Sequence, residues 1–198
     1  MTIDTKDMIN SILSSLSRID YIKPSDIPNI DLYMDQVTTF MDSHLADSKR
    51  YPEDKILTKT MINNYAKNNL LPPPTKKKYS KEHLLVMIFI YYFKGILSIT
   101  DIQSLLNPIT ERYFHSQEFN MEDLYNEVFS LEKAQVERLQ KDILRSYQTS
   151  TDTFSEAPEE DREFLKLFSF ICLLSFDVYV KKQLIEKLID ELPSEKKK

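Results

Sequence analysis

The chain has 198 residues, of which 41% are hydrophobic and 29% are charged, and its formal net charge is −5. Its single glycine cannot supply a glycine-rich phosphate-binding loop and disfavours tight hairpins and β-sandwiches, so we expect a mainly α-helical protein. Its single cysteine excludes an internal disulfide framework, and the N-terminal MTIDTKDMIN lacks the apolar core of a signal peptide. Both features favour a cytoplasmic location.

The charge is distributed unevenly along the chain. Between residues 55 and 94, eight lysines and one glutamate give +7, which leaves −12 for the remainder. A basic centre between acidic flanks favours one dedicated surface for an anionic partner. The longest apolar runs, 84–93 and 164–180, do not predict membrane spans, because the first is too short and the second contains Lys166 and Asp177.

The first part of the chain predicts two amphipathic helices. Apolar side chains recur at helical spacing over residues 4–19, where the helix would cover a core, and over residues 31–46. Pro24 and Pro28 indicate a linker between them. The helix over 31–46 is the candidate supporting helix of a helix-turn-helix, and the loop from residue 46 to 56 is longer than the usual tight turn.

Residues 58–68 predict a short helix with one entirely polar face. At about 100° per residue, the apolar face carries Met61, Ile62 and Tyr65. The opposite face lacks carboxylates and carries amides, a hydroxyl and ammonium groups: Lys59, Thr60, Asn63, Asn64 and Lys67. A solvated helix face usually mixes both charge signs. In a DNA major groove Asn reads adenine and Lys reaches guanine or phosphate, so we interpret 58–68 as a recognition helix.

The segment after this helix predicts a basic wing. Asn69 suits the left-handed conformation that ends many helices, and the prolines at 72–74 favour an extended chain. Ser80 would cap the next helix. A basic strand beside a polar helix would lie along phosphates while the helix occupies the groove. In the wing, 72–79, the residues expected on the DNA backbone are Lys76, Lys77, Lys78 and Tyr79.

The segments TMINNYAKNNLLPPPTKKKYSKEHL and LSITDIQSLL resemble the DNA-binding head of MerR-type winged-helix regulators. In that family an Arg-Tyr-Tyr-like triplet ends the recognition helix, and a Gly-Leu-Leu-Pro-Pro turn, a basic wing closing in Tyr-Ser and a Ser-Leu-x-x-Ile-x-x-Leu-Leu segment follow. The matching positions here are Asn63-Asn64-Tyr65, Asn69-Leu70-Leu71-Pro72-Pro73, Lys77-Lys78-Tyr79-Ser80, and Ser98-Ile99 with Ile102, Leu105 and Leu106. Only the last tyrosine of the triplet is retained, and Asn replaces Gly in the turn.

This resemblance covers about 50 of the 198 residues. More closely, the whole chain resembles an uncharacterised family of predicted DNA-binding proteins from low-GC Gram-positive bacteria. The resemblance implies a winged helix-turn-helix head with a short basic wing over 31–110. An N-terminal docking helix and linker, 1–30, would precede it, and a C-terminal helical bundle or dimerisation region, 111–198, would follow.

The rest of the chain predicts further helices, over 81–94 with Gly95 as terminator, from Ser98 to Pro108, over 121–147 and over 159–192. The last is apolar nearly all round from 164 to 180, so it must be covered on several sides. It is either the hub of a bundle formed by the N- and C-terminal helices or a contact with a second copy. The residues leave both open, and the resemblance favours a homodimer through the C-terminal helices.

Catalytic residues are sparse. His44, His83 and His115 are scattered without metal-ligand spacing, and no nucleophile or nucleotide-binding motif occurs, so we expect neither an enzyme nor a metal or cofactor. The sequence therefore predicts a sequence-specific transcription regulator whose partner is double-stranded DNA, with no membrane association. It identifies no small-molecule effector. The alternative is a helical adaptor whose basic strip binds an acidic protein, although such interfaces favour hydrophobic anchors over Asn and Thr.

Overall fold

The structure, a computed structural model, describes residues 5–16 and 22–193. These residues are mainly helical, which confirms the expected class, and they include a two-stranded antiparallel sheet. They fall into two compact units, one within Met1–Ser130 and the other within Leu131–Lys198. In the described part of the chain, no helix combines the length and apolarity needed to cross a membrane.

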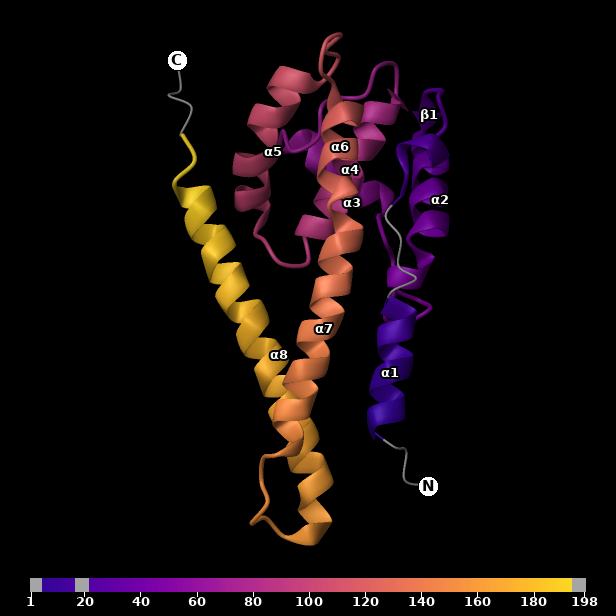
Figure 1. Cartoon of the computed structure of the whole chain (residues 1–198). Helices are drawn as coiled ribbons and strands as arrows, with labels where there is room; N and C mark the ends of the chain where they lie inside the picture. Colours follow the sequence, from indigo (N-terminus) through magenta and orange to yellow (C-terminus); the bar gives the residue numbers. More distant parts are fainter. Residues whose placement is uncertain (1–4, 17–21, 194–198) are drawn as a thin grey trace. The chain divides into compact units, whose positions relative to one another are not determined.

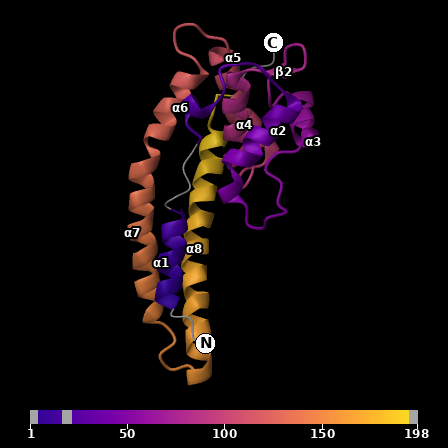
Figure 2. The same cartoon turned by 90° about the vertical axis from the view of Figure 1, so that its right-hand side faces the viewer.

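The elements of the first unit follow one another along the chain; Figure 1 labels its α-helices and β1, and Figure 2 labels β2. They are α1 (Thr5–Leu16), the 3-10 helix η1 (Pro24–Asp26), β1 (Leu32–Tyr33), α2 (Met34–His44), the 3-10 helix η2 (Ala46–Ser48), α3 (Lys59–Lys67), β2 (Lys78–Tyr79), α4 (Lys81–Phe93), α5 (Ile99–Tyr113) and α6 (Met121–Ser130). The second unit contains α7 (Glu132–Thr151) and α8 (Glu159–Asp190). Of the expected helix over 4–19, residues 5–16 form α1, and residues 4 and 17–19 lie outside the described residues.

Helix α4 is the centre of the first unit. Its residues 83–90 are all buried, which explains why this segment has no polar face. Figure 2 shows α2, α3 and β2 gathered around α4, and α4 also contacts α5 and α6. Phe89 packs on Tyr125 of α6, with ring centroids 5.5 Å apart. The surface elements that flank α4 are therefore attached to one buried helix.

The small sheet joins the wing to the start of α2. Leu32 pairs with Tyr79 and Tyr33 pairs with Lys78, in antiparallel register. A tight turn precedes β2, in which the backbone N–H and C=O groups of Thr75 and Lys78 exchange hydrogen bonds of 3.1 and 3.0 Å. The expectation that glycine scarcity disfavours tight hairpins is thus wrong at this turn. Lysine takes the left-handed positions that glycine usually occupies.

Several expected helix bounds differ in the structure. The helix expected over 31–46 begins only at Met34, after β1. Helix α5 continues through Pro108 to Tyr113. Proline removes only the hydrogen bond to the carbonyl of Ser104, and because Ser104 and Pro108 are both exposed, water can take the place of that bond. Helix α4 ends at Phe93, and Gly95 does not adopt a positive φ. The expected helix over 121–147 is two helices, α6 and α7, and the boundary between the compact units falls between them. Helix α6, expected in the C-terminal segment, clusters with the first unit.

Candidate functional site

The polar face of α3 is exposed along its whole length. Thr58 caps the helix, its Oγ1 accepting a hydrogen bond of 3.2 Å from the backbone N–H of Met61. Ile62 and Tyr65 are buried on the opposite side and attach α3 to the core. Five exposed side chains line the outer face, here named the polar ridge: Lys59, Thr60, Asn63, Asn64 and Lys67. The division of α3 into an apolar and a polar face is therefore confirmed.

The end of α3 redirects the chain toward the wing. Asn69 has φ 56°, which confirms it as the left-handed terminator. The backbone N–H groups of Leu70 and Leu71 both donate to the carbonyl of Tyr65, at 2.9 and 3.2 Å. Both leucine side chains are buried and fix the start of the proline segment against the core. The wing thus begins at a defined position relative to the polar ridge.

The tip of the wing presents three lysines. Lys76 and Lys77 are exposed and have φ values of 50° and 64°. Lys78 is partly exposed, and its Nζ lies 5.1 Å from the centroid of the Tyr33 ring. Tyr33 is 54% exposed and belongs to β1. Sequence reasoning placed Tyr33 on the apolar face of a helix, so its position beside the wing lysines was missed, and only strand pairing brings it there.

Tyr79 lies on the inner side of the wing. Its side chain is only 3% exposed, and its ring meets the His83 ring edge-on with centroids 5.5 Å apart. Burial raises the pKa of the Tyr79 hydroxyl. The expectation that Tyr79 lies on a DNA backbone therefore needs correction. In a strand, alternate side chains face opposite sides, so Lys78 and Tyr79 cannot both point outward.

His83 connects the wing to the start of α4. The backbone N–H of Ser80 donates to His83 Nδ1 at 3.0 Å, so Nδ1 is an acceptor and the ring proton is on Nε2. Nε2 then faces the carbonyl oxygen of Pro73 at 3.4 Å. Burial is the largest influence and lowers the His83 pKa, and the nearby His115 acts in the same direction. Hydrogen bonding to Pro73 and the charge of Asp31 oppose this shift. A neutral His83 thus supports the proline segment.

A carboxylate does approach one end of the polar ridge. Asp35, in the first turn of α2, forms an ion pair with Lys59. Both side chains are well exposed to solvent. The ridge lacks carboxylates within α3 itself, as the sequence indicated, but the packing of α2 against α3 supplies one.

The first unit is therefore a helical domain around one buried helix, with the polar ridge and the basic wing attached to it. Residues 22–128 match the family described as Domain of unknown function (DUF1836), and since the match spans more than half of the chain, the protein belongs to this family. The matched segment includes both the polar ridge and the wing. Neither the curated proteins nor the solved structures contain a match.

Proposed function

We propose that the protein is a transcription regulator that binds specific sequences of double-stranded DNA through a MerR-like winged helix-turn-helix head. The observation that carries this proposal is the polar ridge, an exposed face of α3 without carboxylates of its own, while Ile62 and Tyr65 attach the opposite face to the core. The nine residues of α3 span about 14 Å, a length that fits within a major groove. The basic wing next to it supplies charge for phosphates.

The two parts of the site have different roles in this proposal. Thr60, Asn63 and Asn64 contact base edges, because an amide pairs with adenine through two hydrogen bonds and a hydroxyl can donate or accept. Lys59 and Lys67 flank them. The lysines of the wing neutralise phosphates, which contributes affinity without sequence preference.

The division of roles is testable by competition binding with the full chain. A selection from genomic DNA identifies the preferred site, and N63A and K77A are then compared on that site and on random DNA at two salt concentrations. N63A should cost about 1–3 kcal/mol on the preferred site and little on random DNA, whereas K77A should weaken both similarly. With the five lysines of the polar ridge and the wing on phosphates, log affinity should fall against log salt with a slope of about −4.5. Equal losses for both variants on both DNAs would refute the division.

The alternative function is a helical adaptor that binds an acidic protein through the same basic strip. The charge distribution supports both functions, but the polar ridge offers no hydrophobic anchor of the kind that protein interfaces use. If the full chain shifts no genomic DNA fragment in a gel-shift assay at low salt, the adaptor function is favoured over the regulator function.

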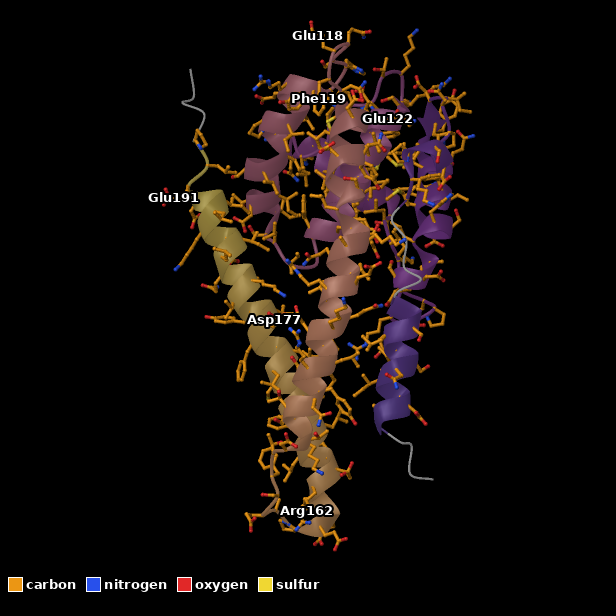
Figure 3. All side chains as sticks on the ribbon, in the orientation of Figure 1. Glu118, Phe119, Glu122, Arg162, Asp177 and Glu191 are labelled. Carbon is orange, nitrogen blue, oxygen red and sulfur yellow. The ribbon has the colours of Figure 1, made fainter. Side chains whose placement is uncertain are left out.

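We further propose that α8 pairs with α8 of a second copy. Five exposed apolar side chains recur at helical spacing on α8 and form one stripe about 100° wide. They are Phe164, Phe168, Ile171, Val178 and Tyr179. Figure 3 labels Arg162 and Asp177, which mark the stretch of α8 where most of this stripe lies. Acidic residues precede this stripe at 159–161, and Lys181 and Lys182 follow it. An antiparallel pair centred near Ile171 would place each acidic end beside a basic end.

The single cysteine provides a direct test of this pairing. Cys172 lies next to the expected centre and is partly exposed, so a short bis-maleimide should link two wild-type chains but not C172S. In the C172S background, E163C should not link to itself in an antiparallel pair, because the two copies of residue 163 would lie about 25 Å apart at 1.5 Å per residue. Linkage at residue 163 would indicate a parallel pair. A monomer without linkage would favour a bundle within one chain.

A further inference from the structure

The connection between α2 and α3 is long for a helix-turn-helix. It runs from Leu45 to Thr58, whereas the compact form of the motif uses a turn of three or four residues. Its backbone hydrogen bonds join near neighbours, such as the Asp54 N–H and the carbonyl of Tyr51 at 3.0 Å. Bonds of this kind shape the loop locally but do not set the direction in which α3 leaves it.

The C-terminal turn of α4 contacts this connection at two points. The Tyr91 hydroxyl forms a hydrogen bond with Ser48 Oγ in η2. The Lys94 Nζ donates to the backbone carbonyl of Ile56 at 2.7 Å. Ile56 is buried and lies two residues before Thr58, the N-cap of α3. The second contact therefore fixes the chain immediately before α3 begins.

The Lys94 side chain is held in place and is not a freely solvated surface group. Its Nζ lies 4.6 Å from the centroid of the Tyr91 ring, over the ring face. Burial lowers the Lys94 pKa. The ring and the Ile56 carbonyl thus replace part of the water around the ammonium group.

The other end of α3 has a matching contact. Gln103 of α5 donates its side-chain amide to the backbone carbonyl of Asn68, the C-cap of α3. Helices α4 and α5 pack on each other. Helix α3 is therefore attached at both ends, through backbone carbonyls, to adjacent helices of the same unit.

We infer that Lys94 is a positioning residue that sets the orientation of α3, with Gln103 as its counterpart at the far end. In this role the bond to Ile56 replaces the constraint that a short turn imposes in a compact helix-turn-helix. The consequence for binding rests on the proposed function: base contacts by the polar ridge require a fixed orientation, whereas phosphate contacts by the wing tolerate small rotations of α3.

Hydrogen exchange of the full chain tests the positioning role without any ligand. K94M removes the donor while keeping a side chain of similar length, and K94R retains a donor. K94M should accelerate exchange of the hydrogen-bonded amides at 62–66 of α3 at least tenfold relative to those at 102–106 of α5, and K94R should restore most of the protection. An equal acceleration in α2, α3 and α5 would indicate a loss of overall stability only. That result, or unchanged exchange in α3, would overturn the inference.

Two further measurements separate this inference from the proposed function. Y91F keeps the ring under Lys94 and removes only the bond to Ser48, so its effect should stay within 46–50. On DNA, K94M should lose affinity for the preferred site about tenfold while affinity for random DNA is kept. If the wild type binds no DNA, the proposed function fails while the exchange result still decides the role of Lys94. If the wild type binds DNA and α3 exchange in K94M is unchanged, only the positioning role fails.

Discussion

Asp35 and Lys59 form an ion pair that joins the first turn of α2 to the first residue of α3. The pair occupies one of the five side chains of the polar ridge. Since both side chains are exposed, the pair contributes at most about 1 kcal/mol to folding. Its main consequence concerns Lys59, because a carboxylate beside a lysine competes with a phosphate for it.

We expect D35N to strengthen DNA binding, since it releases Lys59. The gain should not exceed about fivefold at low salt and should shrink as salt screens the site. Competition binding at two salt concentrations measures it, and chemical denaturation should show a stability change within about 0.5 kcal/mol. D142N changes the same charge in α7 and serves as control; an equal gain there would mean that only net charge matters.

Replacing the two lysines at the tip of the wing should have opposite effects on protein stability and on DNA binding. Lys76 and Lys77 both adopt positive φ, which costs a residue with a Cβ roughly 1–2 kcal/mol relative to glycine. K76N/K77G introduces the residues that such turns prefer, so it should stabilise the protein by about 1–2 kcal/mol while weakening binding to all DNA.

The matched control for the turn is K76Q/K77Q. It removes the same charges and leaves side chains with a Cβ at both positive-φ positions, so it should weaken binding equally without the gain in stability. Urea denaturation and salt-dependent binding give both quantities. If K76N/K77G binds DNA as well as the wild type, the tip does not contact phosphates.

His83 predicts that stability decreases at acidic pH. Its folded-state pKa is lowered, chiefly by burial, from the ordinary value of 6.5. The unfolded chain therefore binds a proton at His83 more readily than the folded protein does. The stability that neutral His83 contributes is complete above pH 6.5 and is lost as the pH falls through the folded-state pKa. Protonation also places a hydrogen on Nδ1, which can then no longer accept from the Ser80 N–H.

Urea midpoints between pH 5 and 8 measure this effect. H83N keeps an acceptor near the Ser80 N–H and cannot titrate, so we expect a less stable protein at pH 8 with a flatter pH dependence below 6.5. A wild-type and an H83N curve of the same slope would show that His83 does not titrate on unfolding.

The Tyr125 hydroxyl links the end of the matched DUF1836 segment to its beginning. It donates to the backbone carbonyl of Ile22 at 2.7 Å, joining residues near the two ends of the match. Both residues are buried. Y125F keeps the ring packing with Phe89 and leaves the Ile22 carbonyl without this donor, so it should cost about 1–3 kcal/mol in urea denaturation. Y51F, at an exposed tyrosine, should change stability by less than about 0.5 kcal/mol.

Periodicity within the chain predicted the features that depend on near neighbours. The two faces of α3 follow from spacing alone, because side chains three and four residues apart share a face. Asn69 as a terminator follows from its tolerance of left-handed conformation. The helical continuation past Pro108 could not be predicted this way, because proline usually ends a helix and its place on the exposed side of α5 depends on how that helix packs.

The sequence by itself determined that this protein is mainly helical and that α3 carries a polar ridge followed by a basic segment, because these properties arise from local patterns of residue type. Only the tertiary structure decided that Tyr79 faces the core, that Asp35 meets Lys59 and that Lys94 holds Ile56. Each of these relations joins residues from different elements. They depend on how helices and strands pack, and no repeat within a single segment specifies that packing.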